Sequence, residues 1–288
     1  MGKKQQQKDS FGERMKAYEN VNRTYLTDGV PKVIRLDGRA FHTFLKNARR
    51  PYDPLVIQSM IYGAVNVMKT IGGTARFAYI QSDEVSIGIN DKPTIESQPW
   101  FGNNVQKMVS ISAAVMSVNF SGRYNICRKP ILKVPLIKPE DGDYFGKDAS
   151  FSPAYFDARI FQVPSIIEMH NAILWRQQDA SKNSISQYAR HFFSHKELEG
   201  KNGSEMQDMM HSVHKFNWND APTWTKRGVL LYRIDRSKKD VIVKENPNLE
   251  LIEDNIVVDW GIPKFSEKPT FLSDIYLPAY LPQENNEA

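Results

Sequence analysis

The chain contains little cysteine and no long apolar run, and each absence excludes a class of protein. Its 288 residues include one cysteine, Cys127, so neither an intramolecular disulfide nor a zinc site built from several cysteines is available. No stretch approaches the roughly 18 continuous apolar residues that a membrane helix requires. The start of the chain, rich in Lys and Gln, has no apolar signal segment. We therefore expect a cytoplasmic protein with no membrane partner.

Familiar nucleotide-binding and hydrolase motifs are missing as well. The chain has no glycine-rich P-loop, no dinucleotide-binding fingerprint and no hydrolase nucleophile elbow. Two histidine pairs, His191 with His195 and His211 with His214, have helical spacing, but zinc would need further ligands of fitting geometry, so we expect surface or core residues here. The sequence does carry an ordinary globular composition and a net charge of +5, which fits a polyanionic partner such as a nucleic acid.

The apolar periodicity predicts an α+β protein whose N-terminal half is a ferredoxin-like β-α-β-β-α-β palm. A first helix, with one apolar face, is expected ahead of this core over residues 11–26. Polymerase palms and nucleotidyl cyclases share this order of elements, so the fold alone does not decide the function. The core elements that we predict are strand 32–36, helix 54–71, strands 76–81 and 85–90, helix 105–116 and strand 158–163.

The C-terminal half is expected to be mainly helical. Ser165 can cap one helix, and residues 183–193 form a second helical stretch. A late strand pair is predicted at residues 229–234 and 241–243. This half packs on the palm or continues the same domain. The two predicted regions are the catalytic palm with its N-terminal helix, residues 1–163, and the mainly helical region, residues 164–288.

Acidic side chains follow two of the predicted strands. Asp37 ends the first strand, and Asp83 with Glu84 lies between the second and third strands. If these strands are neighbours, both aspartates emerge at one edge of the sheet. Phosphoryl transfer uses such hard oxygen ligands to hold two Mg²⁺ ions roughly 3.5–4 Å apart. Gly38 has no Cβ, so its carbonyl can approach a metal or phosphate closely. The alternative is that both acidic groups are ordinary turns.

Several motifs in order resemble one family. The runs Arg35–Phe44 and Gln81–Ser86 are similar to the two signature motifs of the tRNA-His guanylyltransferase family. Further similar runs are Phe156–Arg159, Pro164–Ser165 and Trp175–Asp179, so that the resemblance covers about residues 11–235. It implies a polymerase-like palm that extends RNA in the 3′-to-5′ direction. In this reaction a 5′-monophosphorylated tRNA is activated with ATP, and the 3′-hydroxyl of GTP then attacks the activated phosphate.

The resemblance also assigns roles to residues. Asp37, the Gly38 carbonyl and Asp83 would bind two Mg²⁺ ions, with Glu84 as a catalytic residue beside them. The implied partners are tRNA and nucleoside triphosphates, within a homo-oligomer, typically a tetramer. The implied tRNA-binding residues are Arg176 and Asn183. The implied nucleotide-binding residues are Arg35, Arg39, Ala40, Phe41, His42, Arg50, Ser82 and Lys107.

Two of these assignments leave a plainer alternative open. His42 either positions the nucleotide or is a packed, hydrogen-bonded structural residue between two phenylalanines. Lys107 either contacts a triphosphate or is a solvated lysine on a helix surface.

One segment departs from the family pattern. Eukaryotic members that act on tRNA-His carry His-Ile-Asn-Asn-Leu-Tyr-Asn where this chain has Ser181–Gln187. The difference resembles the bacterial and archaeal branch, which restores missing 5′ nucleotides of tRNAs by pairing with a template. Strict action on tRNA-His and template-dependent repair therefore both remain open. The other functions that the residues allow are a nucleotidyl cyclase on the same palm and a catalytically silent RNA-binding protein.

Overall fold

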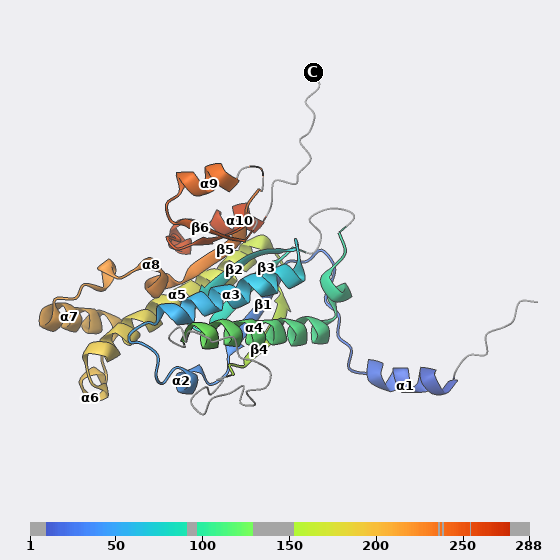
Figure 1. The fold of residues 1–288 in the computed structure, drawn as a ribbon, viewed down its shortest axis with the longest axis horizontal. Coiled ribbons are helices and arrows are strands. Elements are labelled where there is room, and N and C mark those ends of the chain that lie inside the picture. The colour runs from blue at the N-terminus through green and yellow to red at the C-terminus, as the bar shows by residue number, and fades with distance from the viewer. Residues whose placement is uncertain are drawn as a thin grey trace, which may run out of the picture.

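The protein, seen in a computed structural model, forms one antiparallel sheet with helices on both faces (Figure 1). The structure describes residues 10–90, 97–128, 153–235, 237, 239–253 and 255–276. Other residues of the two predicted regions lie outside this part. Within it the sheet has seven strands in the order β4-β1-β3-β2-β5-β7-β6. The strands are β1 Lys32–Gly38, β2 Ala75–Gln81, β3 Glu84–Ile89, β4 Phe156–Gln162, β5 Val229–Arg233, β6 Leu249–Glu253 and β7 Ile256–Asp259.

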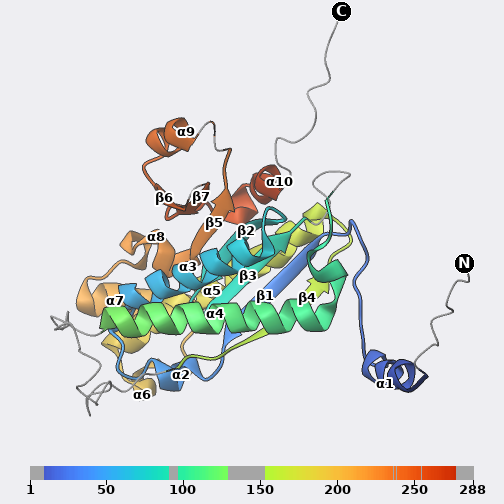
Figure 2. The same ribbon diagram turned by 45° about the vertical axis from the view of Figure 1, so that its right-hand side comes forward.

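Successive side chains of a strand point to opposite faces of the sheet, and a separate hydrophobic core lies on each face. On β1, Ile34 and Leu36 pack with helices α3 (Pro54–Ile71) and α4 (Val105–Arg128). Val33 points to the opposite face, where it packs under α5 (Ile166–Phe192) and α10 (Phe271–Tyr276). Figure 2 shows α3 and α4 running side by side along one face of the sheet. The period of two along a strand produces this three-layer arrangement.

Local signals explain where the long helices begin and end. Asp53 caps α3 by accepting the Leu55 N–H at 2.9 Å, and Pro54 takes the first helical position. Gly72, with φ of 87°, ends the same helix in a conformation that suits glycine. The Ser165 hydroxyl accepts the Glu168 N–H at 3.1 Å, as expected for a capping residue. The two helical stretches predicted after it form one continuous helix, α5, because no Gly or Pro interrupts them.

The N-terminal helix is shorter and more exposed than its pattern predicts. Helix α1 spans Ser10–Asn20 rather than residues 11–26, and none of its residues is buried. Figures 1 and 2 show it apart from the body of the protein. Tyr25, expected on its apolar face, instead forms an isolated β-bridge with Asn104. The predicted helix therefore extends too far, because the segment after Asn20 pairs its backbone with residues at and just before the start of α4.

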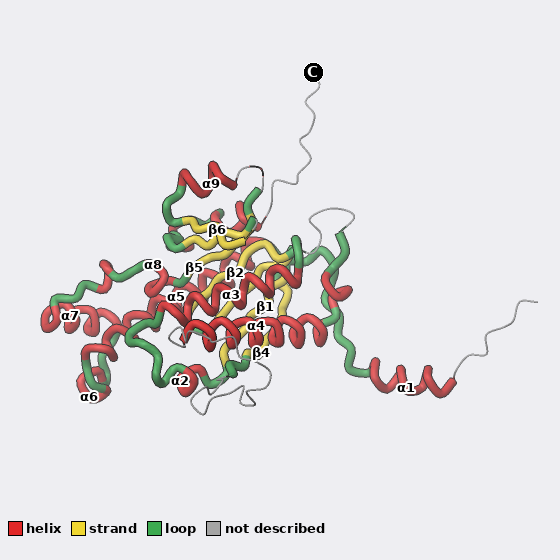
Figure 3. The backbone as a smooth tube through the Cα atoms, in the orientation of Figure 1, coloured by secondary structure: helices red, strands yellow, loops and turns green. Residues whose placement is uncertain are grey.

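The C-terminal region contributes helices and three strands (Figure 3). Strand β5 confirms the first member of the predicted pair, but residues 241–243 lie in helix α9 (Lys239–Glu245), so the second prediction is wrong. Ile242 and Val243 pack as a helical turn against Val257, which a short apolar run cannot distinguish from a strand. The partner of β5 is β7. The shorter helices are α2 Phe41–Phe44, α6 His195–Leu198, α7 Gly203–His214 and α8 Thr223–Arg227. None of the described helices has the length and apolarity needed to cross a membrane.

Candidate active site

The structure brings the two predicted aspartates to one edge of the sheet. Asp37 is the next-to-last residue of β1 and lies opposite Glu84, the first residue of β3. Asp83 precedes Glu84, and its carbonyl accepts the Gly38 N–H at 3.1 Å. The end of β1 is thereby joined directly to the turn that carries Asp83. This connection explains why residues 46 positions apart in the sequence meet at one place.

The charges at this edge are unbalanced. Burial of the Asp83 carboxyl raises its pKa, and the negative charges of Asp37 and Glu84 raise it further, against hydrogen bonds from its own backbone and Ser82. Among the described residues, no Lys or Arg forms an ion pair with Asp37 or Asp83. Two such carboxylates suit a hard divalent cation, which would relieve their repulsion.

Few side chains at this edge could bind a metal. This suits Mg²⁺ better than a metal that needs a complete shell of protein ligands. The described residues contain no cluster of three or more His, Cys, Asp or Glu side chains arranged to hold a metal. Mg²⁺ commonly binds through one or two carboxylates, with water and substrate phosphates completing its octahedron. Asp37 and Asp83 supply two carboxylates, and the backbone of Gly38 lies beside them. The residues present therefore fit the metal that the sequence implied.

Glu84 does not share the open position of the two aspartates. Its carboxylate accepts two hydrogen bonds from Arg176 of α5, each 2.7 Å long, and its side chain is 8% exposed. Arg176 also donates to Asp179 at 3.1 Å, and Asn183 donates to the same Asp179 oxygen at 3.2 Å. The structure thus places the two predicted tRNA-binding residues in one network that ends at Glu84.

The segment after Gly38 packs into the core and so fixes the backbone of the site. An added Cβ at Gly38 would lie 2.4 Å from the ring of Phe41, so glycine is required here by packing. Phe41 is buried against Phe44, Phe120 and Phe156. Ala40 holds a left-handed backbone conformation, with φ of 54°, at the start of α2. Ala40 and Phe41, predicted to bind nucleotide, therefore shape the backbone that presents Gly38.

Three more predicted residues lie near this edge. Arg35 precedes Asp37 on the same face of β1, opposite Arg159 of β4, and its Nε is buried without a hydrogen-bond partner among the described residues. Arg39 and His42 are both exposed to solvent. The alternative in which His42 is a packed structural residue is wrong, because Phe41 takes the buried position instead.

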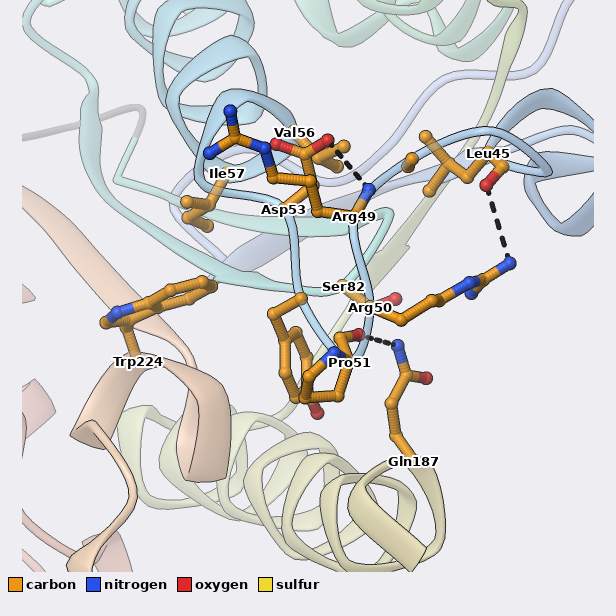
Figure 4. A pocket seen from close by; sticks show the side chains of 12 residues that line it. Leu45, Arg49, Arg50, Pro51, Asp53, Val56, Ile57, Ser82, Gln187 and Trp224 are labelled. Carbon is orange, nitrogen blue, oxygen red and sulfur yellow. Dashed lines mark hydrogen bonds between the residues drawn. The ribbon is translucent and has the colours of Figure 1, made fainter. Parts of the chain in front are cut away.

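A pocket opens next to the turn that carries Asp83, between the loop of residues 45–53 and helices α5 and α8 (Figure 4). Ser82, the neighbour of Asp83, forms part of its wall. Arg50 lies in this wall, and its Nη2 donates a hydrogen bond to the Leu45 carbonyl at 3.4 Å. Gln187 of α5 donates to the Pro51 carbonyl at 2.6 Å. The other lining residues are Ala48, Arg49, Tyr52, Asp53, Val56, Ile57 and Trp224.

Sequence reasoning missed the far wall of this pocket. Gln187 and Trp224 come from helices α5 and α8, more than 130 residues after the loop that they face. A signal for Gln187 did exist, because it lies in the segment Ser181–Gln187 that departs from the family pattern. Trp224 had no such signal, since most tryptophans are core residues.

Lys107 is the predicted site residue that the structure leaves apart. The first turn of α4 packs near the start of β1, where Leu26 N–H bonds to Asn103. The site lies beside the middle of the helix, where Ser117 accepts the N–H of Phe156, the residue that pairs with Gly38. Ten residues of helix separate Lys107 from Ser117, about 15 Å. Lys107 is therefore not among the side chains that meet at the carboxylates.

Fold and site together define a class of protein. An α+β sheet that carries two converging aspartates beside an open, partly basic pocket is the arrangement of an enzyme that transfers phosphoryl or nucleotidyl groups. A family model described as tRNAHis guanylyltransferase matches residues 12–164, more than half of the chain. The chain belongs to this family, and it is a nucleotidyltransferase.

Individual relatives agree with this family. A bacterial tRNA(His) guanylyltransferase (Thg1)-like protein in complex with ATP is 32% identical, with a TM-score of 0.76, over 93% of this chain and all of that one. A structure of such a protein in complex with GTP is 31% identical, with a TM-score of 0.70, over 94% of this chain and all of that one. An uncharacterized protein of Acanthamoeba polyphaga mimivirus is 27% identical over 81% of this chain and 82% of its own.

Proposed function

We propose that the chain adds nucleotides, GTP first, to the 5′ end of a tRNA in the 3′-to-5′ direction, after activation of the 5′ phosphate with ATP. The observation that carries this proposal is the meeting of Asp37 and Asp83 beside a pocket whose wall includes Ser82. Its chemistry supports a nucleotidyl transfer, because hard oxygen ligands and a neighbouring basic loop suit a triphosphate. The complexes of bacterial relatives with ATP and with GTP agree with these two substrates.

Asp37, Asp83 and the Gly38 carbonyl would hold the two Mg²⁺ ions. When bound, such ions neutralise developing charge on the phosphates and lower the pKa of the attacking hydroxyl. The chain itself keeps the two carboxylates at one edge by the bond between Gly38 and the Asp83 carbonyl. Glu84 acts beside them, held by Arg176.

The pocket is proposed to receive the nucleoside triphosphate. Ser82, the residue before Asp83, lines this pocket, and Arg50 supplies a cation from the loop that forms another part of its wall. Trp224 and Tyr52 offer aromatic surface at the same pocket, which suits stacking of a base. Arg35 and Arg39 extend the basic surface beside Asp37, so that phosphates have cations on more than one side of the carboxylates.

The palm and the assembly are proposals of the same kind. The strand order β4-β1-β3-β2, with α3 and α4 on one face, supports a ferredoxin-like palm. Strand β5 pairs in register with β2, which favours one continuous domain over two separate ones. We also expect a homo-oligomer, by the family resemblance alone.

The substrate is proposed to be a tRNA whose 5′ end is truncated, with the opposing nucleotide choosing the base that is added. The basis is the segment Ser181–Gln187, which lacks the His and Tyr of the tRNA-His-specific pattern. The alternative is that one G is added to full-length tRNA-His regardless of the opposing base.

A labelled-nucleotide assay tests these proposals together. The protein is incubated with Mg²⁺, ATP and labelled GTP in the presence of no RNA, of full-length tRNA-His, or of a 5′-truncated tRNA of another specificity. We expect label at the tRNA 5′ end, fastest on the truncated tRNA. A cyclic nucleotide formed without RNA would identify a cyclase instead. No product in any arm would leave an RNA-binding protein as the better reading.

A further inference from the structure

We propose that Arg176 is a positioning residue, which holds Glu84 and thereby fixes the turn that carries Asp83. This inference rests on the proposed function in so far as the turn is the catalytic one. Arg176 lies in α5, 92 residues after Glu84. It therefore ties the helix on one face of the sheet to the edge where the two aspartates meet.

The contact has the geometry of a specific, rigid pair. The Nε and Nη2 atoms of Arg176 each lie 2.7 Å from a different oxygen of Glu84. The two side chains are 15% and 8% exposed, so water screens the pair little. Two parallel bonds between a guanidinium and a carboxylate fix orientation as well as distance. Glu84 therefore cannot rotate without breaking both bonds.

Fixing Glu84 also fixes both aspartates. Asp83 is the preceding residue, and Asp37 lies opposite Glu84 in the β1–β3 ladder. Ser82, the other residue of this turn, has a left-handed backbone with φ of 51°, which is an unfavourable conformation for serine. A turn of this kind persists only when its surroundings hold it. The pair with Arg176 supplies one such restraint, directly after the turn.

The same pair separates the charges at the site. Glu84, Asp83 and Asp37 are three neighbouring carboxylates, and Arg176 compensates the first of them. The negative charges of Asp83 and Asp37 remain available for a cation. Without Arg176, a buried carboxylate would stay uncompensated beside the proposed metal ligands, which is an expensive arrangement.

The surroundings of Arg176 argue for positioning rather than for direct contact with RNA. Its Nη2 also donates to Asp179, which in turn accepts from the exposed Asn183. Its guanidinium carbon lies 4.8 Å from the centre of the Trp175 ring. Within the described residues, two of its three nitrogens are thus engaged with carboxylates. An arginine restrained in this way has little freedom to move to a phosphate.

The test compares Arg176→Ala, Arg176→Lys, Glu84→Gln and the double variant Glu84→Gln with Arg176→Ala. Arg190→Ala is the matched control, because Arg190 is an exposed arginine of the same helix. Three quantities are measured for each protein: kcat and KM for nucleotide addition to tRNA, the melting temperature, and the affinity for Mn²⁺ by calorimetry. Mn²⁺ serves as a probe of the carboxylate pair that does not depend on turnover.

For Arg176→Ala we expect kcat and Mn²⁺ affinity each to fall on the order of 10- to 100-fold, as for other residues that orient metal ligands. KM for tRNA should change less than about twofold, since no ground-state contact with RNA is removed. Arg176→Lys should lie between wild type and Arg176→Ala, because an ammonium lacks the planar fork. The double variant should have a higher kcat and a higher Mn²⁺ affinity than Arg176→Ala, because the neutral amide of Gln needs no counter-charge.

Three results would overturn the proposal. A raised KM for tRNA with unchanged kcat and Mn²⁺ affinity would make Arg176 an RNA contact. A lowered melting temperature with normal Mn²⁺ affinity of the folded protein would show that Arg176 contributes to stability only. A double variant no better than Arg176→Ala would remove the charge argument. If Arg176→Ala does not fold, Arg176→Lys and the double variant decide. If the wild-type protein adds no nucleotide, the proposed function fails. The Mn²⁺ affinities of the variants still test whether Arg176 positions the carboxylates.

Discussion

Two regions of the sheet each hold an aspartate, half-buried at Asp83 and buried at Asp259, with different consequences. Asp83 lies in the turn between β2 and β3, and Asp259 ends β7 at the other side of the sheet. Burial is the largest cause that raises the pKa of each carboxyl. The charges of Asp37 and Glu84 raise that of Asp83 further, whereas the Gly261 N–H bonds to Asp259 at 2.8 Å and opposes the shift.

The difference between these regions separates a site from a structural carboxylate. Asp259 satisfies its oxygen with its own chain two residues later, so its surroundings need no further partner. Asp83 faces other carboxylates that burial makes more repulsive, so its surroundings favour a bound cation. Burial alone would not have told the two residues apart. The neighbouring charges do.

The strongest way to test this comparison is to remove one charge from each region. We expect Asp83→Asn and Asp37→Asn each to lower nucleotide addition by about 10³-fold or more, because each removes an oxygen ligand that stabilises transition-state charge. Asp259→Asn is the matched control and should retain activity. Turnover is measured with 5′-monophosphorylated tRNA at saturating nucleotide. Near-normal turnover of Asp83→Asn would show that this edge is not the site.

A second, smaller effect is expected from Gly38, which joins the site to the core. In Gly38→Ala the added Cβ would displace the Phe41 ring, at a cost of about 1–3 kcal/mol in the free energy of unfolding. Activity should fall with it, because the displaced backbone carries Asp37. Gly73→Ala is the control, since an added Cβ there meets nothing within 4 Å. Urea unfolding compares the two, and equal stability would contradict the packing argument.

A third prediction concerns the pocket wall. Arg50→Ala should raise KM for the nucleoside triphosphate by about tenfold, with a smaller effect on kcat, because one charge-assisted contact to phosphate is lost. Lys46→Ala, an exposed lysine of the same loop outside the pocket wall, is the control. Steady-state kinetics over a range of nucleotide concentrations separates KM from kcat. If both variants behave alike, the pocket does not hold the triphosphate.

The sequence predicts the strands around this edge and the helix caps well because their signals are local. Asp37 lies near the end of β1 and Asp83 follows β2, and the pairing of β1 with β3 places them together. The cap at Ser165 and the proline start of α3 are equally local. Strand ends and helix caps depend on a few adjacent residues, whereas the meeting of the two aspartates depends on the pairing of β1 with β3, which the sequence left as a condition.

The predictions that failed depend on what lies far away in the sequence. The apolar spacing predicts a helix that continues to residue 26, yet α1 ends at Asn20 and Tyr25 forms a β-bridge with Asn104. Residues 241–243 are too short a run to choose between helix and strand. The role of Arg176 depends on a partner 92 residues earlier, and the contact between Gln187 and Pro51 spans 136. Spacing along one helix likewise does not place Lys107, which lies in the first turn of α4 and whose predicted contact with a triphosphate stays a prediction.

The smallest effect is expected at Asp259, and its sign follows from linkage. Its pKa in the folded protein is raised above the unfolded value of about 3.9. The folded state therefore holds the proton more tightly, and the stability contributed by this group is complete below the unfolded pKa and lost as pH rises through the raised one. At neutral pH the wild type carries a buried charge, whereas Asp259→Asn does not. Its amide oxygen can still accept the Gly261 N–H.

We expect Asp259→Asn to be the more stable protein in urea unfolding at neutral pH, and the difference to shrink toward about pH 4. A variant that is less stable than wild type at neutral pH would mean that the charged form is stabilised by its surroundings, and the contrast with Asp83 would then have to be explained by geometry alone.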